Sequence, residues 1–193
     1  MHYSPCHLYQ RDRARELGQP ILNVACKEDP ANLGGDFNAT NIDIEDYDVE
    51  MRVDLYSAVR NFQKMSALHM DFPDATFAHV ILGEFLEHCT EEAARRSLEE
   101  TCRVLRQDGH VTLTFPRDHR TPAQQRTSNY LYEYTDGITT YHQTVWTDPM
   151  LLSVFERTGF REVSKYREEI PYDVCSLPGV PCVGCGIVLE KDR

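Results

Sequence analysis

Positive charge is scarce in this chain. Its 193 residues carry 20 Lys and Arg against 31 Asp and Glu, so the formal net charge is −11. A phosphate backbone would on average be repelled by such a surface, which argues against nucleic acid as the partner. One basic cluster, residues 11–15, contains an interleaved acid and is expected to form a solvated helix face. The composition therefore favours a small-molecule substrate.

Long hydrophobic runs are also missing. No apolar stretch of the sequence approaches the roughly 20 residues that a membrane-spanning helix needs. The first six residues have neither the basic segment nor the apolar segment of a secretory signal. We therefore expect a soluble, cytoplasmic protein with no membrane partner.

The cysteines do not form a recognisable framework. Their number is seven, and an odd count leaves one thiol unpaired, so a disulfide scaffold is not expected in the reducing cytosol. Cys182 and Cys185, with Cys175 upstream, have the local spacing of half a zinc knuckle, but the sequence does not identify a fourth ligand. A strand-like run at residues 187–189 follows directly. This continuation favours buried thiols and no metal site.

No repeat or low-complexity segment interrupts the chain, and its length suits a single domain over residues 1–193. Short β-like runs alternate with helix-length segments, as in βαβ units and doubly wound, Rossmann-like α/β folds with helices on both sheet faces. The expected strands are residues 21–25, 39–44, 78–82, 110–115, 160–166 and 183–189. The expected helices are residues 8–17, 91–105 with Thr90 as N-cap, and 148–158 ending at Gly159.

Two local assignments complete this expectation. A turn at Asp108-Gly109 should precede the strand at residues 110–115. Between residues 45 and 69 two alternatives remain open. Either residues 51–55 form a strand, or residues 55–65 form a helix that feeds a later strand near Met65.

The most specific pattern lies between residues 72 and 116. It contains Phe72-Pro73-Asp74-Ala75-Thr76-Phe77, then Val80-Ile81-Leu82, then Gly83-Glu84-Phe85-Leu86-Glu87-His88, and finally Arg103-Val104-Leu105-Arg106-Gln107-Asp108-Gly109. In this order the passages resemble the second half of a class I S-adenosylmethionine-dependent methyltransferase, of the small, single-domain type 11-like kind. The resemblance implies a seven-stranded sheet, mostly parallel, with an antiparallel hairpin at one edge. It also implies S-adenosylmethionine as cofactor and S-adenosylhomocysteine as product.

The start of the chain resembles the same family less closely. Residues 21–30 and Asn41-Ile42-Asp43-Ile44 are similar to family passages of the form LNLGCGxxP and NxDI. Such families place glycines in the first turn so that the backbone can approach the cofactor closely. Here Ala25 and Lys27 stand at two of those positions. Lys27 would put a charge near a cationic sulfonium, which keeps a non-catalytic relative open as an alternative.

Ligands of doubly wound sheets bind outside the carboxyl ends of the strands, so the candidate residues follow each strand. Asp43 can accept hydrogen bonds from both ribose hydroxyls of a nucleotide; its alternative is an ordinary exposed strand-end acid. By the family pattern the adenine lies against Ser66 and Ala67. If the strand ends at Asp54 instead, that acid takes the adenine contact. The resemblance implies cofactor contacts at Asn23, Ala25, Cys26, Glu28, Asp43, Ile44, Ser66, Ala67 and Gly83.

The acceptor side has three catalytic candidates. Glu84 is a base, an orienter or a counter-charge for the sulfonium, or else a helix N-terminal acid. His88 acts as a base or is a structural group. His142 lies in a tyrosine-rich segment, residues 117–145, with Tyr130, Tyr132, Tyr134 and Tyr141. That segment is either a substrate cap or a loop packed on its own rings.

Three functions fit these residues to different degrees. The leading hypothesis is transfer of the methyl group of S-adenosylmethionine to an O, N or S atom of a small-molecule acceptor. The alternative is a catalytically degenerate methyltransferase fold that serves as a binding or scaffold protein. A nicotinamide-dependent oxidoreductase shares the topology, but the missing GxGxxG disfavours it.

Overall fold

The structure, a computed structural model, describes residues 5–25, 38–44, 61–116, 137–138, 143–172 and 182–192. An eight-stranded sheet runs through this part of the chain in the order β3-β2-β1-β4-β5-β8-β6, and β7 also pairs with β8. The strands are β1 (Ile21–Val24), β2 (Thr40–Asp43), β3 (Phe62–Lys64), β4 (Phe77–Gly83), β5 (Leu105–Pro116), β6 (Phe160–Glu162), β7 (Glu168–Tyr172) and β8 (Cys182–Lys191).

The direction of the strands confirms the predicted fold class. Strands β1 to β5 pair in parallel, whereas β8 is antiparallel to β5, to β6 and to β7. The strand order reverses between β1 and β4, as in a doubly wound sheet. The third strand lies just before Met65, while residues 45–60, which include the alternative strand at 51–55 and Asp54, are outside the described residues.

The predicted count of seven strands was wrong, because the strand expected at residues 160–166 is interrupted. A short 3-10 helix, η2 (Ser164–Tyr166), separates β6 from β7. Its last residue, Tyr166, is buried, and its carbonyl accepts a 2.5 Å hydrogen bond from the hydroxyl of Tyr9. The Tyr166 hydroxyl in turn donates to Oε1 of Glu16 at 2.5 Å. The main chain leaves the sheet to make these contacts, so two short strands stand where one was expected.

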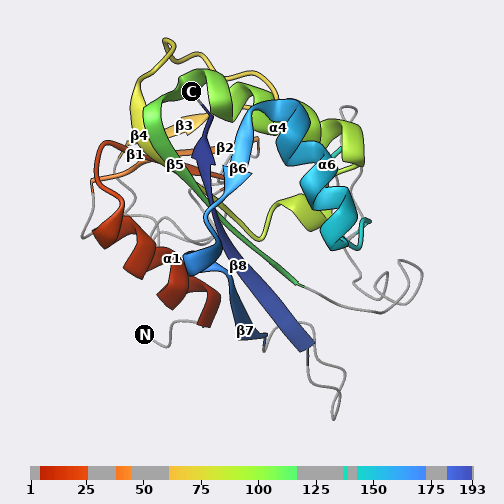
Figure 1. The fold of residues 1–193 in the computed structure, drawn as a ribbon. Helices are drawn as coiled ribbons and strands as arrows, with labels where there is room; N and C mark the ends of the chain where they lie inside the picture. Colours follow the sequence, from red (N-terminus) through yellow and green to blue (C-terminus); the bar gives the residue numbers. More distant parts are fainter. Residues whose placement is uncertain are drawn as a thin grey trace, which may run out of the picture.

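Helices cover both faces of the sheet. On one face, α4 (Glu91–Val104) and α6 (Asp148–Thr158) pack on alternate strand residues such as Leu22, Val80 and Val111. On the other face, α1 (Pro5–Glu16) contributes Ala14 to a cluster with Ile21 and Ile81. Figure 1 shows α1 on one side of the sheet and α4 with α6 on the other. The alternation of strand side chains between the two faces explains this division.

The predicted start of α4 and the predicted end of α6 are confirmed. Oγ1 of Thr90 accepts a 3.2 Å hydrogen bond from the amide of Ala93, so Thr90 is the N-cap of α4. Helix α6 ends at Gly159, whose φ of +77° lies in the left-handed region that glycine adopts without strain. Helix α1 begins three residues before the predicted start and ends one residue before the predicted end.

The turn predicted at Asp108-Gly109 is instead an irregularity within β5. Phe77 pairs with Leu105, but two residues later His79 pairs with His110, so the extra residues of β5 bulge out. Asp108 has a φ of +60°, consistent with such a bulge. The local turn signal was therefore real, but pairing with β4 on both sides keeps the segment inside one strand.

The basic cluster of α1 is less solvated than expected. The guanidinium carbon of Arg13 lies 5.2 Å from the ring centroid of Tyr9 and 4.8 Å from that of Tyr166. Arg11 is also buried, with 9% of its surface exposed. The Arg13 guanidinium thus holds α1 against η2. Among the helices that the structure describes, none combines the length and the apolar character of a membrane-spanning segment.

Candidate active site

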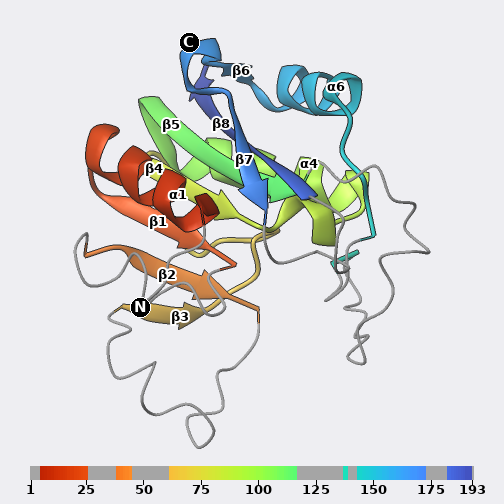
Figure 2. The ribbon, with the colours of Figure 1, turned by 90° about the horizontal axis from the view of Figure 1, so that it is seen from below.

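The carboxyl ends of the parallel strands meet at one edge of the sheet. Asp43 pairs with Lys64 of β3, Val24 with Ile42 and Leu82, and Gly83 with Thr114. Figure 2 shows β1, β2 and β3 running in the same direction. The residues that follow β2, β1 and β4 therefore lie side by side along this edge, where the strand order reverses.

Asp43 ends β2 at this edge, as predicted. It is 4% exposed, and its carbonyl accepts a 2.8 Å hydrogen bond from the amide of Met65. The end of β2 is thereby joined to the segment after β3, which contains Ser66 and Ala67. The predicted ribose and adenine contacts thus occupy one continuous part of the edge, with Ile44 directly after Asp43.

The first turn keeps the backbone conformation of a glycine without having one. Ala25 follows β1 with a φ of +53°, in the left-handed region where a β-carbon is strained. A cofactor approaching the end of β1 therefore meets the turn conformation that family glycines favour, with one extra methyl group. Cys26, Lys27 and Glu28 lie outside the described residues.

Glu84 follows β4 in a similarly strained conformation. Its φ is +54°, and its amide donates a 2.8 Å hydrogen bond to the carbonyl of Thr114. Strained residues held in place by their surroundings cluster at functional sites. Of the strand ends that the structure describes at this edge, those of β1 and β4, next to each other in the sheet, are followed by such residues.

Gly83, just before Glu84, is needed for close packing. A β-carbon at this position would stand 2.3 Å from Nε2 of Gln10 in α1. Nε2 of Gln10 also donates a 2.8 Å hydrogen bond to Oγ1 of Thr114. With 1% of its surface exposed, Gln10 brings a buried amide beside the ends of β4 and β5.

Sequence reasoning missed Gln10. Its contact partners are about seventy and a hundred residues away in the chain, and α1 has little apolar patterning that would reveal an inward face. The missing side chain at Gly83 was the only available signal, because such a residue at a strand end often marks a close approach.

Asn23 lies inside β1 rather than past its end. Its Nδ2 donates a 3.0 Å hydrogen bond to Oδ1 of Asn41, and both side chains are buried. The amide of Asn41 continues to the carbonyl of Ala39 at 3.1 Å. The described contacts of the Asn23 amide therefore run within the sheet, and a cofactor contact of Asn23 stays a prediction.

The predicted adenine strip, Ser66 and Ala67, forms a tight turn. Oγ of Ser66 accepts a 3.2 Å hydrogen bond from the amide of Leu68, and the carbonyl of Ser66 accepts one from His69 at 3.2 Å. A hydroxyl oxygen has two acceptor lone pairs, so Ser66 can still accept from an exocyclic amine. Ala67 is buried at 5% exposure.

His88 belongs to a second 3-10 helix, η1 (Leu86–His88), which is tied to the segment before α6. The carbonyl of His88 accepts a 2.7 Å hydrogen bond from Nε2 of Gln143, and the same amide donates to the carbonyl of Gly137 at 2.9 Å. The indole of Trp146 donates to the carbonyl of Leu86 at 2.8 Å. The described end of the predicted cap, at Gly137 and Gln143, and Trp146 just beyond it are thus hydrogen-bonded to η1 or to each other.

His142 and the tyrosines at positions 130, 132, 134 and 141 lie outside the described residues, as does most of the predicted cap at residues 117–145. The catalytic roles of Glu84, His88 and His142 stay predictions.

The cysteine candidates show no sign of a metal site in the described part. Within the described residues no group of three or more His, Cys, Asp or Glu side chains converges on a common point. Cys185 lies buried inside β8, and Cys175 is outside the described residues.

Comparison with known proteins identifies a domain within the chain. The sequence model of a methyltransferase domain matches residues 26–113. That match spans the predicted motifs from just after β1 to β5. No curated protein sequence matches the chain.

Solved structures share the fold at low sequence identity. A methyltransferase from Methanosarcina mazei, described as S-adenosylmethionine-dependent, aligns at 16% identity with a TM-score of 0.67, over 92% of this chain and 96% of that one. One from Clostridium acetobutylicum aligns at 7% identity with a TM-score of 0.69, over 100% and 93%. The 1,6-didemethyltoxoflavin-N1-methyltransferase of Burkholderia thailandensis, with bound S-adenosylhomocysteine, aligns at 18% identity with a TM-score of 0.63, over 97% and 80%. The matching sequence model thus identifies a methyltransferase domain at residues 26–113, and these solved structures share its fold.

Proposed function

We propose that this protein transfers the methyl group of S-adenosylmethionine to an O, N or S atom of a small-molecule acceptor and releases S-adenosylhomocysteine. One observation carries the proposal: the end of β1, followed by Ala25, lies between Asp43 at the end of β2 and Gly83-Glu84 at the end of β4, on the carboxyl edge of the sheet. The net charge of −11 favours a neutral or cationic acceptor over an anionic polymer.

The residues present fit the cofactor. A carboxylate at the end of β2 suits a ribose, because it accepts hydrogen bonds from both hydroxyls. The left-handed conformation of Ala25, with φ +53°, supports close approach of a ligand to the backbone after β1.

The sulfonium of the bound cofactor supplies both the methyl group and the leaving group, so direct in-line displacement needs little further chemistry. The chain's own part is orientation. Asp43 holds one end of the cofactor, and the turns at Ala25 and Glu84 set the position of the reacting atoms. Where the acceptor arrives protonated, Glu84 takes the proton, or His88 if the acceptor lies nearer η1.

Ligand binding tests this function before any acceptor is known. Thermal unfolding is measured with S-adenosylhomocysteine and, in parallel, with NAD and NADP. Stabilisation should grow as RT ln(1 + [L]/Kd), about 2.7 kcal/mol at a hundredfold excess over Kd. A shift with S-adenosylhomocysteine alone supports the proposal. No shift at millimolar ligand would favour the degenerate binding or scaffold protein, and a shift with NAD would favour the oxidoreductase.

A further inference from the structure

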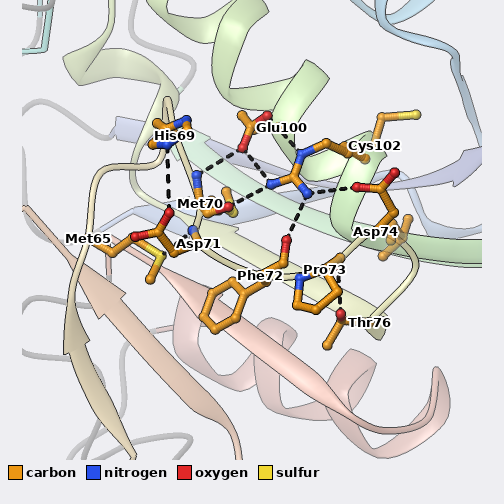
Figure 3. Close-up of polar contacts among 12 residues, drawn as sticks. Met65, His69, Met70, Asp71, Phe72, Pro73, Asp74, Thr76, Glu100 and Cys102 are labelled. Atoms are coloured by element: carbon orange, nitrogen blue, oxygen red, sulfur yellow. Dashed lines mark hydrogen bonds and ion pairs between the residues drawn. The ribbon is translucent and has the colours of Figure 1, made fainter.

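A single arginine of α4 contacts three residues of the segment between β3 and β4. Arg103, in the last turn of the helix, directs Nε and Nη2 to the two carboxylate oxygens of Glu100, at 3.0 and 2.9 Å. Nη2 also donates to the carbonyl of Met70 at 2.6 Å. Nη1 donates to the carbonyl of Phe72 at 2.7 Å and to Oδ1 of Asp74 at 2.8 Å. Figure 3 shows these contacts.

Every donor of the guanidinium is used. An arginine side chain has five N–H groups in a fixed planar arrangement, and each of the five contacts above takes one of them. A lysine has three donors on one rotating atom and cannot serve acceptors spread around a plane. The contact therefore depends on arginine and not merely on positive charge.

Met70 is the residue that this arrangement fixes most strongly. Its carbonyl accepts from Arg103, and its amide donates a 2.8 Å hydrogen bond to Oε2 of Glu100. The hydrogen bond from Arg103 holds the pKa of the Glu100 carboxyl below its usual value, so this acceptor is ionised at neutral pH. The side chain of Met70 is 1% exposed in the main core. Both backbone polar groups and the side chain of Met70 are thus held.

The adenine strip lies between Met70 and the end of β2. At one side of the strip, the amide of Met65 donates to the carbonyl of Asp43 at 2.8 Å. At the other side stands Met70. Ser66 and Ala67 lie in the chain between Met65 and Met70, and the hydrogen bonds of both methionines therefore determine where they lie.

We infer that Arg103, through Glu100 and Met70, is a positioning residue that holds Ser66 and Ala67 in place for the adenine of the cofactor. The inference rests on the proposed function. Arg103 does not itself contact the adenine strip in the structure; it acts through Met70, three residues beyond Ala67. This gives a role to the arginine of the Arg103-Val104-Leu105-Arg106 passage and links it to the Phe72-Pro73-Asp74 passage, which the sequence presents as separate motifs.

Calorimetry with two ligands tests the inference. The ligands are S-adenosylhomocysteine and S-inosylhomocysteine, in which an oxo group replaces the exocyclic amine. The parent should prefer the adenine compound. Arg103→Lys should lower affinity for that compound by about fivefold or more and narrow the preference between the two ligands, because the strip no longer meets the amine in a fixed position. A purely structural role would leave the preference unchanged.

Matched variants separate this role from loss of fold. Glu100→Gln keeps the size of the side chain but replaces one acceptor oxygen with a donor, so it should narrow the preference in the same direction even where Arg103→Lys folds poorly. Asp74→Ala removes the exposed ion pair with Arg103 but leaves the hydrogen bonds of Met70 to Arg103 and Glu100 in place. Arg95→Lys alters an arginine of the same helix that pairs only with Glu92 and Glu99 among its described contacts. Both of these should bind like the parent.

Two results would overturn the inference in distinguishable ways. If the parent binds S-adenosylhomocysteine and both Arg103→Lys and Glu100→Gln retain its affinity and its preference within about twofold, Arg103 is structural and the proposed function stands. If the parent binds neither ligand, the proposed function fails and the inference fails with it.

Discussion

The side chain of Gln10 fills the space at the end of β4 where a side chain of residue 83 would lie; that residue is Gly83. The amide nitrogen of Gln10 lies 2.3 Å from the point where a β-carbon of residue 83 would stand, and its carbonyl carbon lies 2.8 Å from that point. The same nitrogen is hydrogen-bonded to Oγ1 of Thr114 at 2.8 Å. The first helix of the described chain thus meets the candidate site through one buried amide, where only a glycine leaves room for it.

This relationship predicts strong coupling between positions 83 and 10. Gly83→Ala should destabilise the protein by about 1–3 kcal/mol, the cost of overpacking a well-filled site. Gln10→Ala should cost about 1 kcal/mol or more, because Thr114 loses a buried partner. In the double variant the new methyl group fills the space that the amide leaves, so Gly83→Ala should cost little stability in the Gln10→Ala background. Urea unfolding of all four proteins measures the coupling, and losses that add within about 0.5 kcal/mol would show that the two residues act independently.

The left-handed turns at Ala25 and Ala75 predict that glycine stabilises both. Their φ values are +53° and +55°. A non-glycine residue is strained by about 1–2 kcal/mol in this conformation. Replacing it with glycine removes the strain but costs about 0.4–1 kcal/mol, because glycine makes the unfolded chain more flexible. Ala75→Gly, at an exposed turn, should therefore raise the free energy of unfolding by about 0.5–1 kcal/mol. Ala25→Gly should raise it less, because the Ala25 methyl packs against the main core.

The two alanine variants should differ in ligand binding. Ala25→Gly removes a methyl group beside the proposed cofactor position and should strengthen binding of S-adenosylhomocysteine, whereas Ala75→Gly is the matched control and should leave the affinity unchanged. Calorimetry measures both. Equal affinities in the parent and in Ala25→Gly would show that the missing glycine does not limit cofactor binding.

The sequence predicts best those features whose causes are local. Helix α6 begins and ends where expected, because its start before Pro149 and its left-handed Gly159 are signals within the helix itself. Asp43 could likewise be placed at a strand end from the short passage Asn41-Ile42-Asp43-Ile44, which resembles the family's NxDI. The class of the sheet follows from the alternation of such runs.

Features set by distant contacts escaped prediction. The break between β6 and β7 depends on a hydrogen bond from Tyr9 to Tyr166, which are 157 residues apart. Asp108-Gly109 has the residues of a turn, but pairing with β4 on both sides makes it a bulge within β5. Gln10 was missed for the same reason, since nothing near it in the chain shows that Thr114 is its partner. In each case the deciding interaction forms only once the sheet has assembled.

Asp43 should determine cofactor affinity with little effect on folding. Asp43→Ala removes the side-chain acceptor and should weaken binding of S-adenosylhomocysteine by about 1.5–3 kcal/mol, the range for hydrogen bonds to a charged group. Asp71→Ala is the control, because this acid follows β3 in the chain but its side chain is 83% exposed. Calorimetry on both variants, with circular dichroism to check the fold, measures the difference. Binding by Asp43→Ala at the parent's affinity would place the ribose acid elsewhere.

His79 should make the protein sensitive to acid. It is fully buried in β4, and its Nε2 lies 2.8 Å from Oγ1 of Thr112. Burial lowers its pKa from 6.5 to about 3, and the neighbouring His110 adds to the effect. Below pH 6.5, His79 is protonated in the unfolded chain but stays neutral in the folded one. The free energy of unfolding therefore decreases as the pH falls from about 6.5 towards about 3. At higher pH both states are neutral at this site and it contributes no pH dependence.

The variant His79→Gln isolates this contribution, because glutamine keeps an amide that can pair with Thr112 but does not titrate near neutral pH. One proton of difference between the two states is worth about 1.4 kcal/mol per pH unit. Between pH 7 and pH 5 the parent should therefore lose about 2 kcal/mol more of its unfolding free energy in urea than the variant does. His110→Gln is the comparison within the same strand pair; partial burial also lowers the pKa of His110, so its difference should have the same sign and be smaller. Parallel pH profiles for the parent and His79→Gln would mean that His79 binds a proton equally well in the folded and unfolded states. The prediction that burial lowers its pKa would then be wrong.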